Sequence, residues 1–106
     1  MKIGILGNMN NNGNNLVQYL REAGADAHLL LYENEAVHFT PDADEIAPPD
    51  YPQKTLTWGS YKNFMNPAIG RQVRADIAPF DLLIGSRLAP AYMARFAGRP
   101  LDGFMP

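Results

Sequence analysis

The sequence contains no cysteine. This absence excludes a disulfide framework, a thiolate nucleophile and a zinc site built from cysteines. Long apolar runs are also absent, because a run such as Ala27 to Leu31 is much shorter than the roughly 20 residues of a membrane-spanning helix. The apolar start from Met1 to Gly7 is too short for the core of a signal peptide. We therefore expect a cytoplasmic protein without a transmembrane segment.

An excess of positive charge is missing as well. Nine Lys and Arg residues stand against eleven Asp and Glu residues, which gives a formal net charge of −2 and argues against a nucleic-acid-binding protein. The charge is unevenly distributed, since the segment from Glu22 to Asp50 contains acidic residues but no Lys or Arg, whereas basic residues outnumber acidic ones from Lys54 onward. Ordinary solvated surfaces are the preferred explanation of this division, and a basic side that faces an anionic ligand such as a phosphate is the alternative.

The first third of the chain has the pattern of a βαβ unit. Lys2 to Gly7 predicts a buried strand, and an Asn- and Gly-rich turn follows it. A helix then ends at Gly24, and Ala27 to Tyr32 predicts a second strand. The apolar face of that helix is formed by Leu16, Val17, Leu20 and Ala23. Such units connect parallel strands in nearly every known case.

Residues 33–60 interrupt this alternation. The segment contains several prolines among acidic residues, which exclude a regular helix or a central strand. We interpret it as a long, proline-rich surface excursion.

The alternation resumes after the excursion. Asn66 with Pro67 predicts a helix start, Leu82 to Gly85 a strand, residues 90–96 a helix that Gly98 ends, and the last residues a further strand. Residues 1–106 therefore predict one α/β domain, a Rossmann-like three-layer sandwich with a short, mostly parallel sheet of about four strands.

Candidate ligand-binding residues follow the predicted strands, because open α/β sheets bind ligands at the carboxyl ends of their strands. The turn after the first strand offers backbone N–H groups and a helix N-terminus to an anion, and the planar guanidinium of Arg87 suits a phosphate. Glu33 follows Gly13 by about 20 positions in the sequence, which is the spacing typical of an acidic residue that contacts a ribose. Alternatively, Glu33 contacts the acceptor substrate. The predicted phosphate-binding residues are Gly7, Asn8, Asn11, Asn12, Gly13, Asn14, Ser86 and Arg87.

Three named motifs are incomplete in this sequence. A P-loop requires Lys and then Ser or Thr after its last glycine, whereas asparagines follow Gly13. A dinucleotide fingerprint that starts at Gly7 lacks two of its glycines, because Met9 and Asn12 occupy their positions. Ser86 lacks the second glycine of a nucleophile elbow. No catalytic residue, metal-ligand set or cofactor is predicted.

Four other side chains have two interpretations each. His28, within the second predicted strand, is interpreted as a structural or surface residue in preference to a base. His38, a lone histidine of the excursion, either reaches a cleft or has no functional role, and the second interpretation is preferred. Trp58 and Tyr61 either line an acceptor site or cover the edge of the sheet.

Several segments together resemble the start of a GT-B glycosyltransferase of the retaining, glycogen-synthase-like branch. The resemblance covers most of the chain and is carried by residues 1–7 with the Asn-rich turn to Gly13, 27–31, 80–86 and 98–102. It implies an N-terminal, acceptor-side Rossmann-like domain whose first turn, at Asn12 and Gly13, lies against the diphosphate of a nucleotide-sugar donor.

The resemblance also implies a C-terminal domain that grips the donor, and the sequence ends before any such domain. We therefore expect residues 1–106 to be an incomplete GT-B N-terminal domain, inactive alone, from an enzyme that transfers a sugar from a nucleotide-sugar to an acceptor. Two alternatives from other classes stay open: a non-catalytic Rossmann-like module that binds a nucleotide or NAD, and an incomplete domain that associates through an unpaired sheet edge.

Overall fold

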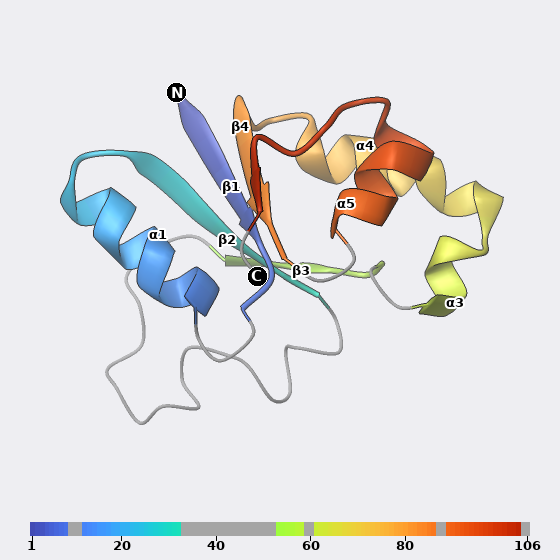
Figure 1. The fold of residues 1–106 in the computed structure, drawn as a ribbon, viewed down its shortest axis with the longest axis horizontal. Helices are drawn as coiled ribbons and strands as arrows, with labels where there is room; N and C mark the ends of the chain where they lie inside the picture. Colours follow the sequence, from blue (N-terminus) through green and yellow to red (C-terminus); the bar gives the residue numbers. More distant parts are fainter. Residues whose placement is uncertain (9–11, 33–52, 59–60, 87–88, 105–106) are drawn as a thin grey trace.

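The computed structural model describes residues 1–8, 12–32, 53–58, 61–86 and 89–104. Helices lie between most of the successive strands in the described residues (Figure 1). The elements in chain order are β1 (Lys2–Leu6), α1 (Asn12–Glu22), β2 (Asp26–Tyr32), β3 (Gln53–Leu56), α3 (Tyr61–Phe64), the 3₁₀ helix η3 (Pro67–Ile69), α4 (Gly70–Ile77), β4 (Leu82–Gly85), α5 (Ala89–Tyr92), the π-helix η4 (Met93–Ala97) and β5 (Gly103–Phe104).

The strands of the described residues form one sheet of five strands in the order β3-β2-β1-β4-β5, and every pair is parallel. This arrangement confirms the predicted α/β class and the Rossmann-like sandwich. Its strand order is the classic order of a doubly wound sheet. The difference of one strand from the prediction comes from β3.

Strand β3 lies inside the segment that the sequence predicts as an excursion, so the excursion does not extend unbroken to residue 60. Pro52 directly precedes the strand, and β3 pairs with β2 alone at the end of the sheet order. Proline is tolerated beside an edge strand because an edge strand needs only one row of partners. The buried side chains of Leu56 and Trp58 fix this segment on the sheet. Residues 33–52 lie outside the described residues.

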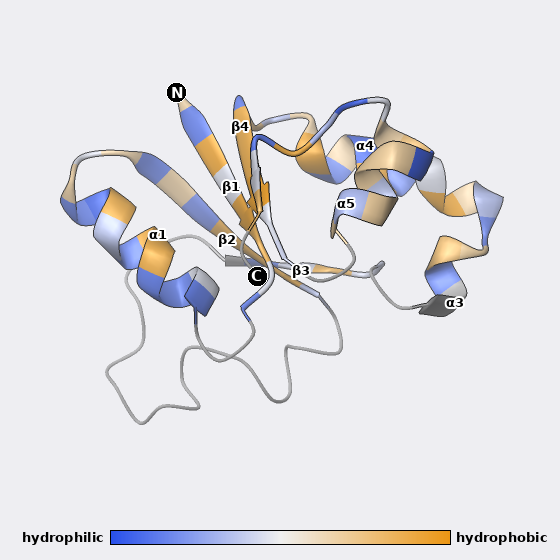
Figure 2. Ribbon diagram, in the orientation of Figure 1, coloured by the Kyte–Doolittle hydropathy of each residue, from blue (hydrophilic) through white to orange (hydrophobic). Residues whose placement is uncertain are grey.

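Both faces of the sheet carry a hydrophobic core. Helix α1 covers one face, and α3, α4 and α5 lie on the other (Figure 1). Apart from the hydrophilic band at its start, β1 is hydrophobic or pale along its length (Figure 2), as expected for a parallel strand that is buried on both faces. The α1-side core consists of Ile3, Ile5, Val17, Ala27, Leu29 and Leu31, and the larger core opposite includes Leu6, Leu30, Trp58, Val73, Phe80, Leu83, Tyr92 and Phe96.

The helix ends follow the residues that the sequence singled out. Gly24 has a φ of 92°, and its N–H donates to the carbonyl of Arg21 just after α1. Asn66 caps η3 by accepting from the N–H of Ala68, and Gly98 ends η4 with a φ of 62°. Positive φ is accessible to glycine without the steric cost of a side chain. These predicted boundaries are confirmed.

Among the described residues, no helix combines the length and the apolar character needed to cross a membrane.

Candidate functional site

The candidate site lies where the carboxyl ends of β1 and β4 meet. These strands are neighbours in the sheet although α1 and β2 follow β1 in the chain, so the strand order reverses between them. Ligands of open α/β sheets bind at this reversal. Gly7 and Ser86 come directly after the two strands, and the N–H of Ser86 donates to the carbonyl of Leu6 at 3.1 Å.

A close approach of backbone atoms holds the start of α1 against the end of β1. Gly7 has a φ of 101°, and its N–H donates to the carbonyl of Leu30 at 2.8 Å. A Cβ atom at Gly13 would collide with the carbonyl oxygen of Gly7 and come within 3.1 Å of Leu29 Cδ1. Because the colliding atom belongs to the backbone, a side chain at Gly13 requires α1 to move. Glycine at this position therefore sets the distance between the helix N-terminus and the strand end.

Two asparagines bury polar groups at the N-terminus of α1. Asn8 is fully buried, and its Oδ1 accepts a hydrogen bond of 2.7 Å from the N–H of Asn14. This bond satisfies one of the N–H groups that a helix start leaves without an intrahelical partner. Asn14 is 3% exposed, and its own Oδ1 has no hydrogen-bond partner among the described residues. An unpaired buried amide oxygen is costly, and it can accept from a hydroxyl or an N–H of a ligand.

Ser86 joins the ends of three strands. Its Oγ donates to the carbonyl of Leu6 at 3.2 Å, and its own carbonyl accepts from the hydroxyl of Tyr32 at 3.4 Å. Since the hydroxyl hydrogen is directed to Leu6, Ser86 Oγ can act toward a ligand only as an acceptor.

The structure brings together five of the residues that the sequence predicts as a phosphate site: Gly7, Asn8, Gly13, Asn14 and Ser86. Asn12 is the exposed first residue of α1. Asn11, Glu33 and Arg87 lie outside the described residues, so the described part of the candidate site is neutral. Attraction for an anion would therefore come from the N–H groups and dipole of α1.

The histidines and aromatic residues that the sequence analysis considered are not part of the described candidate site. His28 is largely buried on β2 and packs edge-on against Phe80, in agreement with its structural interpretation. Trp58 belongs to the hydrophobic core, where it contacts Tyr32 and Tyr92. His38 and the side chain of Tyr61 lie outside the described residues.

A second polar cluster surrounds Asp76, which the sequence analysis did not single out. Asp76 is 3% exposed and accepts from Trp58 Nε1 at 2.8 Å, Gln72 Nε2 at 2.9 Å and Lys54 Nζ at 2.7 Å. Burial raises the pKa of Asp76, but these three hydrogen bonds outweigh burial and leave the pKa below its ordinary value. The signal was present in the sequence, because helical spacing places Asp76 on the same side of α4 as Val73 and Ile77.

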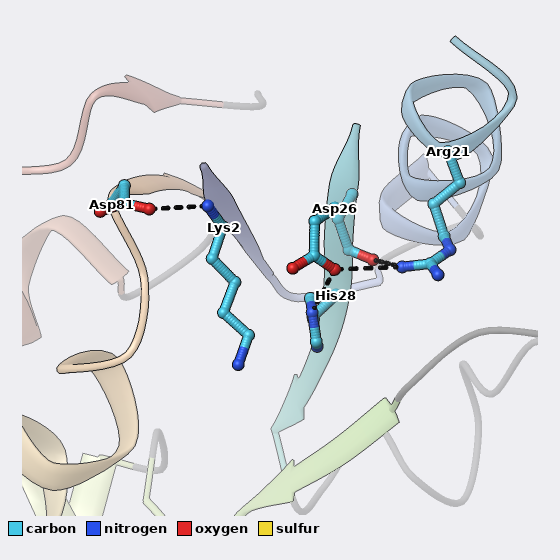
Figure 3. A network of polar contacts seen from close by, with 6 residues as sticks. Lys2, Arg21, Asp26, His28 and Asp81 are labelled. Atoms are coloured by element: carbon cyan, nitrogen blue, oxygen red, sulfur yellow. Dashed lines mark hydrogen bonds and ion pairs between the residues drawn. The ribbon is translucent and has the colours of Figure 1, made fainter. Parts of the chain in front are cut away.

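A third network joins elements at the amino end of the sheet (Figure 3). Asp26 accepts from His28 Nε2 at 2.8 Å and lies 3.6 Å from Arg21 Nη1, and the backbone N–H of Lys2 donates to Asp81 at 2.7 Å. The hydrogen bond from His28 holds the pKa of Asp26 below its ordinary value, with help from the charges of Lys2 and Arg21. The described residues contain no group of three or more His, Asp or Glu side chains arranged to hold a metal ion.

Comparisons with models of known protein families, with curated proteins and with solved structures found no match to this chain. Inferences about its function therefore rest on its fold and on the geometry of its residues.

Proposed function

We propose that this chain is the N-terminal, acceptor-side part of a glycosyltransferase and presents its first βα turn to the diphosphate of a nucleotide-sugar. The observation that supports this role most directly is the seating of α1 on the end of β1, where Gly13 permits contact with the backbone of Gly7. N–H groups held in this way face the place where ligands of such sheets bind. A cytoplasmic location, without nucleic-acid partners, belongs to the same proposal.

The chemistry of such a site follows from its neutral donors. When a glycosidic bond to a diphosphate breaks, negative charge grows on the leaving oxygens. Donors fixed by packing stabilise that charge without having to reorganise during the reaction. The unpaired Oδ1 of Asn14 adds an acceptor for a hydroxyl of the nucleotide or the sugar. A second domain, which we propose closes over this edge, would exclude water and complete the site.

Binding of a nucleotide-sugar can be tested on the chain itself by following backbone amide signals during titration with UDP-glucose or ADP-glucose. We expect saturable shifts at Gly13 and Asn14. The variant Asn12→Asp adds a negative charge to the exposed first residue of α1. It should stabilise the helix by about 0.5 kcal/mol through the macrodipole, and it should weaken diphosphate binding about tenfold by repulsion.

The matched control is Gln18→Glu, the same amide-to-carboxylate change farther along α1. It should leave binding unchanged because the dipole effect is confined to the first turn. If neither nucleotide-sugar shifts Gly13 and Asn14, or if both variants weaken binding equally, the diphosphate site at α1 is wrong.

A non-catalytic NAD-binding or nucleotide-binding module is the second candidate, because the observed strand order is the one that begins the dinucleotide-binding fold. Saturable NAD binding that weakens in Glu33→Ala would favour this module. Binding of nucleotide-sugars without NAD binding would favour the glycosyltransferase.

A further inference from the structure

A small cavity lies on the face of the sheet that α4 covers, and it shares no lining residue with the candidate diphosphate site. Its volume is about 190 Å³, and its lining includes Lys2, His28, Leu30, Lys54, Asp76 and Phe80. These residues come from the three neighbouring strands β1, β2 and β3, from α4 and from the turn before β4.

The charges of the side chains that line the cavity do not cancel. Asp76 accepts hydrogen bonds from Lys54, Trp58 and Gln72. This buried carboxylate thereby balances the charge of Lys54. The ammonium group of Lys2 forms no ion pair with any described residue, because only the backbone N–H of Lys2 bonds to Asp81. Apart from His28, the charged groups of the lining sum to one positive charge, which the ammonium group of Lys2 supplies. That charge also acts on the carboxylate of Asp26, which lies outside the lining and whose pKa it lowers.

The side chain of Lys2 extends over the same part of the sheet as His28 (Figure 3). Its Nζ lies 5.8 Å from the centre of the Phe80 ring. The ring is buried and meets the His28 ring edge-on at 5.5 Å, and Leu30 beside them is buried as well. The cavity therefore has an ammonium group that forms no direct ion pair with any described residue, beside an apolar, partly aromatic wall.

This combination suits a ligand with a carboxylate at one end and an apolar body at the other. A cavity of about 150 Å³ holds benzene, so the volume here accommodates a ring of that size with one carboxylate. Nothing in the described lining resembles the cluster of backbone N–H groups or the guanidinium fork that recognises a free phosphate. We propose that this cavity binds a small organic monocarboxylate whose anionic group pairs with Lys2 Nζ and whose apolar body packs on Phe80.

Benzoate is a suitable probe, and benzamide is its neutral counterpart of nearly the same shape. We expect benzoate to shift the amide signals of Lys2, His28 and Phe80 saturably, and benzamide to bind about tenfold more weakly because it lacks the charge. Inorganic phosphate should cause no saturable shift at these residues. This comparison uses the unaltered protein, so it does not depend on the folding of a variant.

Variants then test whether the positive charge of Lys2 binds the carboxylate. Lys2→Gln should weaken benzoate binding about fivefold or more, and Lys2→Arg should restore most of the affinity because it keeps the positive charge. Arg71→Gln, an equal loss of charge at an exposed position of α4 outside the cavity lining, is the matched control and should leave binding unchanged. The proposal is wrong if benzoate and benzamide bind equally, if phosphate competes at equal strength, if benzoate shifts none of the three residues, or if Arg71→Gln weakens binding as much as Lys2→Gln.

Discussion

Polar side chains at the two ends of the sheet differ in charge and in burial. At the carboxyl end, Asn8, Asn14 and Ser86 are neutral and buried. At the amino end, the interacting side chains are charged and more exposed, with Asp26 54% and Arg21 34% exposed. Water competes with the pairs at the amino end, whereas it is excluded from the groups at the carboxyl end.

This difference predicts which end determines stability. A buried polar atom must keep its partner, and a backbone contact as close as that of Gly13 leaves no room for adjustment. Exposed charges exchange one partner for water at little cost. We therefore expect substitutions at the carboxyl end to cost more stability, although more of the charges on the described residues lie at the amino end.

The largest effect is expected for Gly13→Ala. The added methyl group would collide with the carbonyl oxygen of Gly7, which cannot rotate away as a flexible side chain can. We expect a loss of about 3 kcal/mol or more in the free energy of unfolding, measured by urea denaturation. Asn15→Ala, at an exposed position of the same helix, is the control and should change stability by less than about 0.5 kcal/mol. Equal stability of the two variants would contradict the close contact.

Asp76 separates the effect of burial from the effect of charge, because it is charged and yet buried. Asp76→Asn removes the ion pair with Lys54 and places amide hydrogens opposite a donor, so we expect a loss of about 2 kcal/mol at neutral pH. Trp58→Phe removes one of the three donors and keeps most of the ring, so its loss should be smaller. If Asp76→Asn behaves like an exposed substitution, burial does not decide the difference between the ends.

The pH dependence of this effect has a defined sign. The folded pKa of Asp76 is below its ordinary value of 3.8. Its stabilising contribution is therefore fully present above the unfolded pKa and is lost as the pH falls through the folded pKa. Below about pH 4, the free energy of unfolding, measured by denaturation at several pH values, should depend less on pH for Asp76→Asn than for the original chain. If the free energies of unfolding of the two proteins depend equally on pH, the folded pKa of Asp76 is not lowered.

Much of the fold could be predicted from local patterns. Gly24, the Asn66–Pro67 pair and Gly98 mark helix ends through their own backbone geometry or capping, which does not depend on distant residues. Strand β3 was missed because prolines and acidic residues dominate its surroundings, while its formation depends on pairing with β2 and on burial of Trp58. Such tertiary contacts override local propensity.

The candidate site was predictable in position but not in detail. Strand ends identify Gly7, Asn8 and Ser86, since parallel strands place their carboxyl ends together. The direction of the Ser86 hydroxyl depends on Leu6, which is 80 positions away in the chain. The burial of Asn14 likewise depends on how closely α1 approaches β1. Sequence patterns do not contain these distances.

Ser86→Ala should have a moderate effect. It removes the hydrogen bond from Oγ to the carbonyl of Leu6, but that carbonyl keeps the bond from the N–H of Ser86. We therefore expect a loss of about 1 kcal/mol or less in urea denaturation. A loss as large as that of Gly13→Ala would mean that the hydroxyl, rather than the backbone contact, holds the strand ends together.

The smallest effect on stability is expected for the Asp26 network, and its more informative measurement is a titration. The hydrogen bond from His28 is the main cause that lowers the pKa of Asp26, ahead of the charges of His28, Lys2 and Arg21. The stabilising contribution of Asp26 is thus present above its ordinary pKa of 3.8 and is lost as the pH falls through the lower folded value. Because Asp26 is 54% exposed, this contribution is small, and Asp26→Asn should leave the unfolding curve at neutral pH nearly unchanged.

Carboxyl chemical shifts followed against pH give the pKa of Asp26 directly. His28→Gln should raise this pKa toward its ordinary value because it removes the hydrogen bond from Nε2 that lowers it most. Arg21→Gln should raise it less, because Arg21 lies farther away at 3.6 Å and is the last of the contributing charges. If the pKa of Asp26 is ordinary in the original chain, or if Arg21→Gln has the larger effect, the bond between His28 and Asp26 does not organise the amino end. That end would then consist of independent surface charges, and its contrast with the packed carboxyl end would be sharper still.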